Sequence, residues 1–191
     1  MRVGVLALQG GVAEHLSMLE RAGARGIPIR NASQLAEVEG LILPGGESTA
    51  IGRLLHRSGL AEAIIQRARG GMPVWGTCAG MILLAREIAG EEVRHLGLMD
   101  IRVRRNAYGG QLESFIAHRV VPEVAQAPLP LVFIRAPYIE AMGPGVRPLL
   151  DLEGKTVAAR QEHLLATAFH PELTDRVEFH RYFVQMVSAQ E

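Results

Sequence analysis

The sequence predicts an α/β fold with three layers: a mostly parallel central sheet, helices on both of its faces, and antiparallel strands appended to the sheet. Two observations favour this class. In the first half of the chain, short aliphatic runs without polar alternation are separated by helical patterns. In the middle of the chain, one strand pattern follows another, with Gly-Gly, Pro and Asn between them.

The first half supplies strands and helices in alternation. The strands are expected at residues 3–8, 27–30, 40–43 and 73–75, with 27–30 the weakest pattern, and the helices at residues 12–22, 49–56 and 61–69. Right-handed crossovers would place the loops that follow the strands at one edge of the sheet. Open α/β sheets bind their ligands at this edge.

The second half continues with strands. Met99, Ile101 and Val103 alternate with charged residues, and antiparallel strands are expected within residues 98–121 and 129–140. A strand over residues 164–169, a His-Pro break and a helix over residues 176–187 complete the predicted fold. Because the chain has no internal repeat and no linker-like segment, we interpret residues 1–191 as a single domain.

The composition limits the classes of partner. Twenty Lys and Arg residues balance 20 Asp and Glu residues, so a nucleic acid or an anionic membrane would find no excess of positive charge. The single cysteine cannot form an intramolecular disulfide, and no apolar run is long enough for a signal peptide or a membrane span. We therefore expect a cytoplasmic protein.

The strongest local motif surrounds Cys78. Residues 73–85 read as a buried strand, a sharp Gly-Thr-Cys-Ala-Gly turn and a helix that begins just after the cysteine, which is the sulfur counterpart of a nucleophile elbow. Gly76 and Gly80 would let the strand and the helix approach closely. The helix N-terminus would favour the thiolate. The alternative is a cysteine that only packs in the core.

A cysteine nucleophile needs a base, and His170 is the candidate. It stands at the end of a predicted strand, and Glu172 could fix the tautomer of the imidazole and stabilise the imidazolium. The alternative is a surface His-Pro-Glu turn. On their helical patterns, His15, His56 and His180 are interpreted as solvated. The sequence assigns no role to His95, His118 and His163.

A third motif, Pro-Gly-Gly-Glu-Ser-Thr at residues 44–49, also follows a predicted strand. Its glycines would let backbone N–H groups turn toward a ligand, as an oxyanion hole requires. The alternative is that Ser48 or Thr49 caps the following helix. Because all three motifs end at one edge of the sheet, we expect nucleophile, base and oxyanion donors to converge there.

In combination, the motifs at residues 44–49, 76–80 and 169–172 resemble those of the class I, triad-type glutamine amidotransferases. Within that family, residues 6–15, 105–109 and 133–137 are similar to the glutaminase subunits of pyridoxal 5′-phosphate synthase. The resemblance covers essentially the whole chain. One departure is Gly110, where an arginine is expected after Tyr-Gly.

The resemblance implies hydrolysis of the side-chain amide of L-glutamine to L-glutamate and ammonia. Cys78 would form a thioester, His170 would transfer the protons, and Glu172 would orient His170. The oxyanion would be held by the backbone N–H groups of Gly46 and Ala79. Substrate contacts are implied for Gly46, Glu47, Ser48, Arg105, Ile134 and Arg135. Glu47 is the candidate anion for the α-ammonium, and Arg105 or Arg135 the candidate cation for the α-carboxylate, although without the family both arginines read as solvated charges.

The resemblance also implies a partner, the (β/α)₈-barrel subunit of the synthase, which uses the ammonia to build pyridoxal 5′-phosphate. The loop at residues 9–11 and the helix after it would lie at that contact, and no metal or cofactor is expected. Three alternatives remain at this point: a glutaminase subunit of another synthase, a non-catalytic redox or binding protein built on the same cysteine elbow, and a cysteine peptidase.

Overall fold

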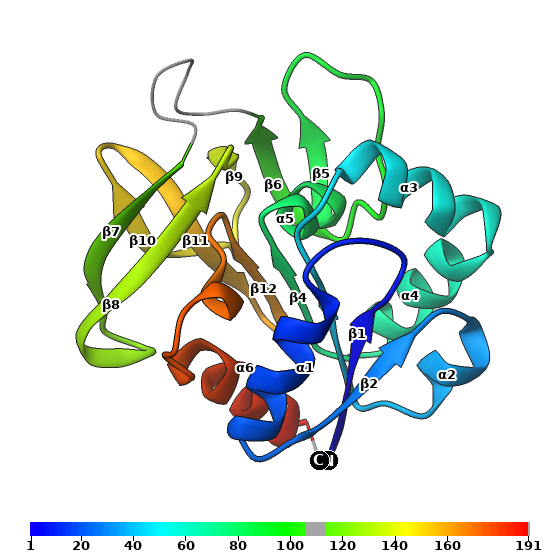
Figure 1. Ribbon diagram of the computed structural model, residues 1–191. Helices are drawn as coiled ribbons and strands as arrows, with labels where there is room; N and C mark the ends of the chain where they lie inside the picture. The colour runs from blue at the N-terminus through cyan, green and yellow to red at the C-terminus, as the bar shows by residue number, and fades with distance from the viewer. Residues whose placement is uncertain (106–113, 191) are drawn as a thin grey trace.

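The computed structural model describes residues 1–105 and 114–190 (Figure 1). The strands are β1 (Arg2–Leu6), β2 (Arg25–Ile29), β3 (Gly40–Leu43), β4 (Val74–Thr77), β5 (Ala85–Ile88), β6 (Met99–Arg104), β7 (Ser114–Val121), β8 (Ala125–Ile134), β9 (Tyr138–Met142), β10 (Arg147–Leu152), β11 (Lys155–Gln161) and β12 (Leu164–Thr167). The helices are α1 (Val12–Arg21), α2 (Ala32–Ala36), α3 (Ser48–Arg57), α4 (Leu60–Arg69), α5 (Ala79–Leu84) and α6 (Glu178–Ser188), with a 3₁₀ turn, η1 (Pro171–Leu173).

The parallel part of the sheet has the strand order β2-β1-β3-β4-β12. Every residue of β3, β4 and β12 is buried, as the unbroken aliphatic runs predict for strands covered on both faces. Pro28 is tolerated in β2 because this strand lies at the edge of the sheet, where a missing N–H costs no ladder bond. The parallel core is thus confirmed, with every boundary within two residues of the predicted one.

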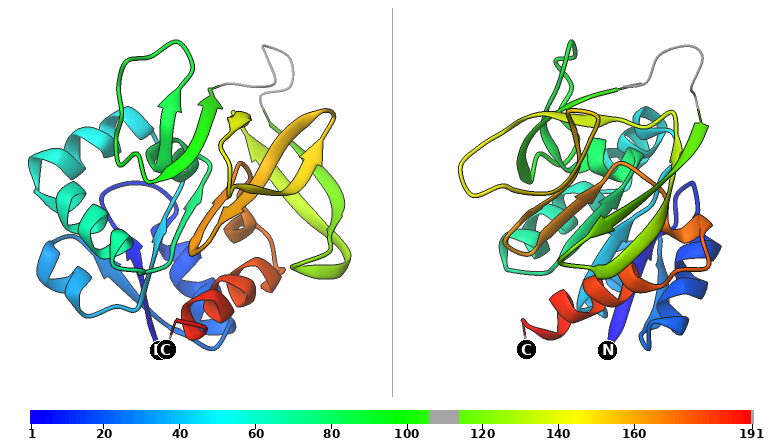
Figure 2. Two further views of the ribbon diagram at one scale, coloured as in Figure 1. Left: turned by 180° about the vertical axis from the view of Figure 1, so that it is seen from behind. Right: turned by 90° about the vertical axis from the view of Figure 1, so that its left-hand side faces the viewer.

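Helices cover both faces of this core. From β1 to β2 the chain moves across the sheet in one direction, and from β2 to β3 and on to β4 it moves in the opposite direction. Because the crossovers are right-handed, α1 lies on one face of the sheet and α2, α3 and α4 lie on the other. Helix α6 packs beside α1, and α4 contacts both α2 and α3. The views in Figure 2 show these two groups of helices apart from each other. The predicted three-layer arrangement is confirmed.

The second half of the chain adds antiparallel strands, as predicted. Strands β11, β9 and β6 continue the sheet beyond β12 in antiparallel pairs, with β10 paired antiparallel to β11, while β7 and β8 form a separate two-stranded antiparallel sheet. Strand β5, from the first half of the chain, lies at the end of the main sheet and pairs parallel with β6. Strand β12 ends at Thr167, two residues before the predicted end, and α6 begins two residues later than predicted. Strands β10 and β11 lie between the predicted ranges 129–140 and 164–169 and were not predicted. The short elements α2 and β5 were also not predicted, because five and four residues are too few to show a period.

Close backbone approach shapes the edge of the sheet near Cys78. A Cβ built on Gly80 would lie 2.0 Å from the carbonyl oxygen of Leu43, and one built on Gly76 would lie 2.3 Å from the carbonyl oxygen of Gly80. Any larger residue would push α5 away from β3 and β4. Both glycines are therefore required by the geometry of the turn.

Replacing Gly80 with alanine should lower the free energy of unfolding by about 2–3 kcal/mol, because the added methyl group meets backbone that cannot move aside. A matched control is Gly145→Ala, where nothing lies within 4 Å and only the φ of +88° is unfavourable, for a cost of about 1 kcal/mol. Urea unfolding of both variants measures the difference. Equal losses would contradict the role assigned to Gly80.

Candidate active site

Cys78 lies in the sharp turn between β4 and α5. Its backbone has φ 50° and ψ −105°, which is rare for a residue other than glycine and is typical of strained functional sites. The Cys78 N–H donates to the carbonyl oxygen of Thr167 at 2.8 Å, so the ends of β4 and β12 hold the turn. The residue is 8% exposed and faces a pocket. As predicted, the helix begins directly after the cysteine.

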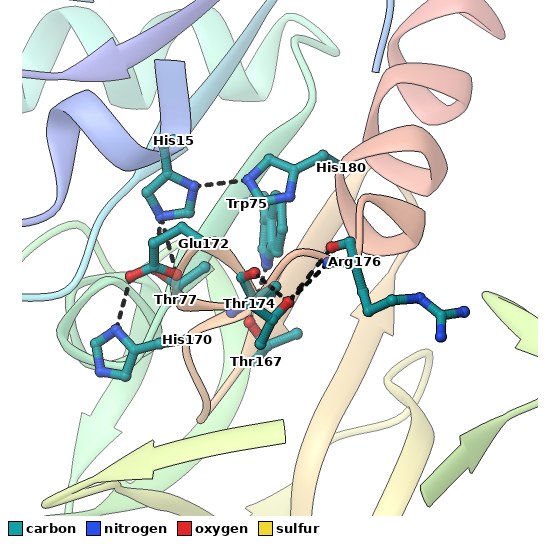
Figure 3. Close-up of polar contacts among 10 residues, drawn as sticks. His15, Trp75, Thr77, Thr167, His170, Glu172, Thr174, Arg176 and His180 are labelled. Atoms are coloured by element: carbon teal, nitrogen blue, oxygen red, sulfur yellow. Dashed lines mark hydrogen bonds and ion pairs between the residues drawn. The ribbon is translucent and has the colours of Figure 1, made fainter. Parts of the chain in front are cut away.

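His170 reaches the same pocket from the end of β12. Its backbone N–H donates to the carbonyl oxygen of Val132 on β8 at 2.8 Å, and Pro171 begins η1 directly after it. The Nδ1 atom of His170 lies 2.7 Å from Glu172 Oε1 (Figure 3). This contact leaves the Nε2 atom of His170 for Cys78. Glu172 is buried, so it is not part of a surface His-Pro-Glu turn.

The charge of His170 is set by opposing effects. Burial disfavours the imidazolium, but hydrogen bonds and electrostatic attraction involving Cys78 and Glu172 outweigh it and raise the pKa of His170 to about 10. The charged ring therefore contributes stability that is fully present below pH 6.5 and is lost as the pH rises through about 10. A protonated imidazole beside the sulfur favours the nucleophilic thiolate.

The glycine loop after β3 closes the site on the third side. A Cβ built on Gly45 would lie 2.5 Å from His170 Cε1, and one built on Gly10 would lie 1.7 Å from the carbonyl oxygen of Gly45. Gly46 has φ +151°, and the next N–H, that of Glu47, donates to Gln9 Oε1 at 2.9 Å. The loops after β1 and β3 and the segment after β12 are thus in direct contact.

A pocket of about 430 Å³ lies between these elements. It is lined by Gly46, Glu47, Ser48, Cys78, Ala79, Ile82, Arg105, Ile134, Arg135 and His170. Every residue predicted to contact substrate or oxyanion is in this set, and Glu172 lies behind His170. Ile82, on α5, was not predicted. Its place one helical turn after Cys78 could have suggested that it lines the pocket.

The start of α3 differs from the prediction that Ser48 or Thr49 caps the helix. The cap is Glu47, whose carboxylate accepts hydrogen bonds from the N–H groups of Thr49 at 3.0 Å and Ala50 at 2.8 Å. The bond from Thr49, followed by smaller effects that include Arg105, lowers the pKa of Glu47 although burial opposes this. Thr49 and Ala50 hold the second and third positions of the helix, the N–H groups that a capping side chain normally satisfies, so Ser48 and Thr49 lie inside the helix and are not its cap.

The two arginines at the pocket have different surroundings. Arg105 Nη1 donates to Ser48 Oγ, and its Nε pairs with Glu91, which holds the guanidinium at the rim of the pocket. Arg135 follows β8 and has φ 45°, a second non-glycine residue in the left-handed region beside the pocket. The pairing of Arg105 with Glu91 was not predicted, since 14 residues separate them in the sequence.

The histidines on the helices correct the sequence interpretation. His56 is exposed as expected, but His15 and His180 are fully buried, not solvated. His15 lies on the apolar face of α1 with Met18 and Leu19, and its charged neighbours in the sequence point elsewhere. His180 occupies the same kind of position on α6 beside Phe179 and Phe183. The i, i+3 and i, i+4 spacing from His15 to Met18 and Leu19, and the i, i+3 spacing from His180 to Phe183, could have revealed both.

Comparison with known proteins assigns the family. The model of the SNO glutamine amidotransferase family matches residues 5–189. The chain belongs to this family. A relative named pyridoxal 5′-phosphate synthase subunit PdxT, from Caldanaerobacter subterraneus subsp. tengcongensis, is 52% identical over 189 residues, which are 98% of this chain and 100% of the relative. A protein of the same name from Niallia circulans is 54% identical over 187 residues, covering 98% of each chain.

A solved structure supports the same assignment. The crystal structure of a glutamine amidotransferase superposes on this chain with a TM-score of 0.92 and 42% sequence identity. The match covers 97% of this chain and 98% of the other. The fold predicted for class I glutamine amidotransferases is therefore confirmed. Gly110, the one departure from the family pattern, lies outside the described residues, as do residues 106–109.

None of the helices within residues 1–105 and 114–190 has the length and apolar character that a membrane span needs. Over the same residues, no three His, Cys, Asp or Glu side chains come together in a way that could hold a metal ion.

Titration of His170 tests the arrangement of charges in the site. In an NMR titration, the imidazolium of His170 should persist above pH 8 and lose its proton near pH 10. Glu172→Gln should lower this pKa by at least about one unit, because a neutral amide stabilises the cation less than a carboxylate does. The matched control is Glu140→Gln, whose carboxylate pairs with Arg102 and Arg104 on the neighbouring strand. An unshifted pKa in Glu172→Gln would contradict the pairing.

Proposed function

We propose that this chain is the glutaminase subunit of a pyridoxal 5′-phosphate synthase. It hydrolyses the side-chain amide of L-glutamine to L-glutamate and delivers the ammonia to a partner synthase subunit. The observation that carries the proposal is the line of Cys78, His170 and Glu172 at the pocket wall, in a member of the glutamine amidotransferase family whose relatives bear the name of this synthase.

The reaction begins with attack by the Cys78 sulfur on the carboxamide carbon of glutamine. The carbonyl π bond opens to an oxyanion, and His170 then donates a proton to the amide nitrogen as the C–N bond breaks. The products of this half-reaction are ammonia and a glutamyl thioester on Cys78. Glu172 holds His170 in the orientation for both transfers and stabilises its charged form.

The second half-reaction hydrolyses the thioester. His170, now neutral, accepts a proton from water, whose oxygen attacks the thioester carbon, and the C–S bond breaks to release the thiolate and the carboxylic acid of the product. The acid then loses its proton to solvent and becomes glutamate. The imidazolium and thiolate of the starting state are restored, so protons balance over the cycle. In each tetrahedral intermediate, the N–H groups of Gly46 and Ala79 hold the oxyanion, and one such donor contributes about 10² to 10³ in rate.

The rim of the pocket provides charges for a free amino acid. Both oxygens of Glu47 cap α3, but each oxygen retains a second lone pair that can accept from an α-ammonium group. Arg105 and Arg135 provide planar donors for the α-carboxylate. Gly46, Ser48 and Ile134 complete the substrate contacts. A peptide chain has neither of these end charges, which disfavours a peptidase.

The ammonia product needs a receiver, because the free molecule diffuses away. We assign this role to the (β/α)₈-barrel subunit of the synthase, with contact through residues 9–11 and α1, which lie directly beside the catalytic loops. Ammonia would pass through this contact without release to solvent. Residues 1–191 act as one glutaminase domain in the cytoplasm, and the reaction on this chain uses no cofactor and no metal.

The proposal is tested by glutamate release from glutamine in the presence of the synthase subunit. The wild type should form glutamate and ammonia in equal amounts, and Cys78→Ala should lower kcat by at least about 10³-fold, because the nucleophile is lost. A matched control is Thr156→Ala, whose hydroxyl group donates to Asp151 on the sheet away from the pocket. Unchanged turnover in Cys78→Ala would refute the proposal.

The glycine loop leads to a second expectation, that the isolated chain is slow. The Gly45–Gly46 peptide can rotate its N–H away from the oxyanion position, and docking of the partner near residues 9–11 would fix it. We expect kcat of the isolated chain to be at least about tenfold lower than that of the complex, with the difference measured by the same assay. Equal rates would show that the oxyanion hole is already formed without the partner.

A further inference from the structure

The line of Cys78, His170 and Glu172 continues inward to two histidines that the reaction scheme does not use. His15, on α1, lies between Glu172 and His180, on α6, and Figure 3 shows these side chains in a row behind His170. His15 Nε2 is 3.5 Å from Glu172 Oε2, and His15 Nδ1 is 2.9 Å from His180 Nε2. His15 and His180 are completely buried, and Glu172 is 6% exposed.

Two polar atoms of this row have no hydrogen-bond partner among the described residues, Glu172 Oε2 and His180 Nδ1. A buried carboxylate oxygen without a donor is costly. The nitrogen that faces Glu172 Oε2 is His15 Nε2, which also lies 3.3 Å from the hydroxyl oxygen of Thr77. The cost is reduced if this nitrogen carries a proton.

The surroundings determine where the protons lie. Burial, with His180 and His170 nearby, lowers the pKa of His15 well below its usual value, and burial with Arg21 lowers the pKa of His180 to about 3. Both rings are therefore neutral near pH 7, and each carries one N–H.

Only one pair of tautomers suits this row. If both rings are protonated at Nε2, His180 donates to His15 Nδ1, His15 points its N–H at Glu172 Oε2, and the unpartnered His180 Nδ1 is a lone pair. In the opposite arrangement, a lone pair of His15 faces the carboxylate and His180 Nδ1–H is a buried donor without an acceptor. The first arrangement avoids both costs.

We propose that His15 is a positioning residue of the glutaminase site. Its Nε2–H holds the Glu172 carboxylate in line with His170, and His180 fixes the tautomer of His15. Gly11, directly before α1, also forms part of the wall behind this carboxylate, because a Cβ built on it would lie 3.3 Å from Glu172 Oε1. The inference rests on the proposed glutaminase function.

Three variants separate positioning from packing. His15→Leu fills the space with an apolar side chain that has no donor, His15→Gln keeps an N–H donor near the Nε2 position, and Thr77→Val removes the other polar neighbour of Nε2.

The titratable groups that face Glu172 are His15 from α1 and His170 from the same segment as Glu172. His180 of α6 lies behind His15, and Cys78 lies beyond His170.

In the complex with the synthase subunit, His15→Leu should lower kcat for glutamine by about 10- to 100-fold and leave KM within about twofold, because a misplaced carboxylate impairs the reaction more than binding. The high-pH limb of the kcat/KM profile should move to lower pH, since His170 loses part of its stabilisation. His15→Gln should recover at least about tenfold of the loss, and Thr77→Val should lose less than about threefold.

The proposal is overturned if His15→Leu keeps the wild-type kcat, if its pH limb does not move, or if Thr77→Val loses as much as His15→Leu. A second measurement needs neither a variant nor activity: ¹⁵N NMR of the wild-type chain should show His15 and His180 protonated at Nε2. Protonation of His15 at Nδ1 would overturn the positioning role proposed for His15. Absence of glutaminase activity in the wild-type complex would refute the proposed function alone, because the NMR result decides the position of the protons independently.

Discussion

The hydrogen bond from the Cys78 N–H to the carbonyl oxygen of Thr167 is the constraint on which the site depends. It joins the end of β4 to the end of β12, so that the strained turn with the sulfur and the segment with His170 leave the sheet side by side. The backbone of His170 is held in turn by Val132 on the outer two-stranded sheet. Nucleophile and base are therefore positioned by main-chain bonds, which side-chain motion does not disturb.

Burial and polar partners act in opposite directions on the pKa values of the histidines in the site. Burial lowers the pKa of His15 and keeps it neutral, whereas the pKa of His170 is raised to about 10 even though most of that ring is also buried. The difference lies in the partners: His170 has both the sulfur and a carboxylate, and His15 has another neutral ring and a carboxylate at longer range. Histidines of one small region can thus have opposite charge states at the same pH.

The sequence predicts most of the parallel core and the chemical groups of the site, because both depend on local patterns. Strand β3 was predicted at its observed bounds, since Gly40–Leu43 is an unbroken apolar run, and the Cys78 elbow follows from the two glycines that flank it. What the sequence cannot supply are contacts between distant segments. The Gln9 side chain that accepts from Glu47, 38 residues away, depends on the order of strands in the sheet, and so does the burial of His15 behind Glu172.

Trp75 is the only tryptophan of the protein, and it belongs to the same buried layer as the two inner histidines. Its ring lies edge-on to His180 at 4.9 Å and to His15 at 5.8 Å, and its Nε1–H donates to Thr167 at 3.0 Å. A protonated imidazole at such a distance quenches indole fluorescence, whereas a neutral ring does so much less. When the indole is excited selectively over the three tyrosines, the emission comes from one tryptophan placed three residues before the nucleophile, and it reports directly on the layer beneath the catalytic groups without any added label.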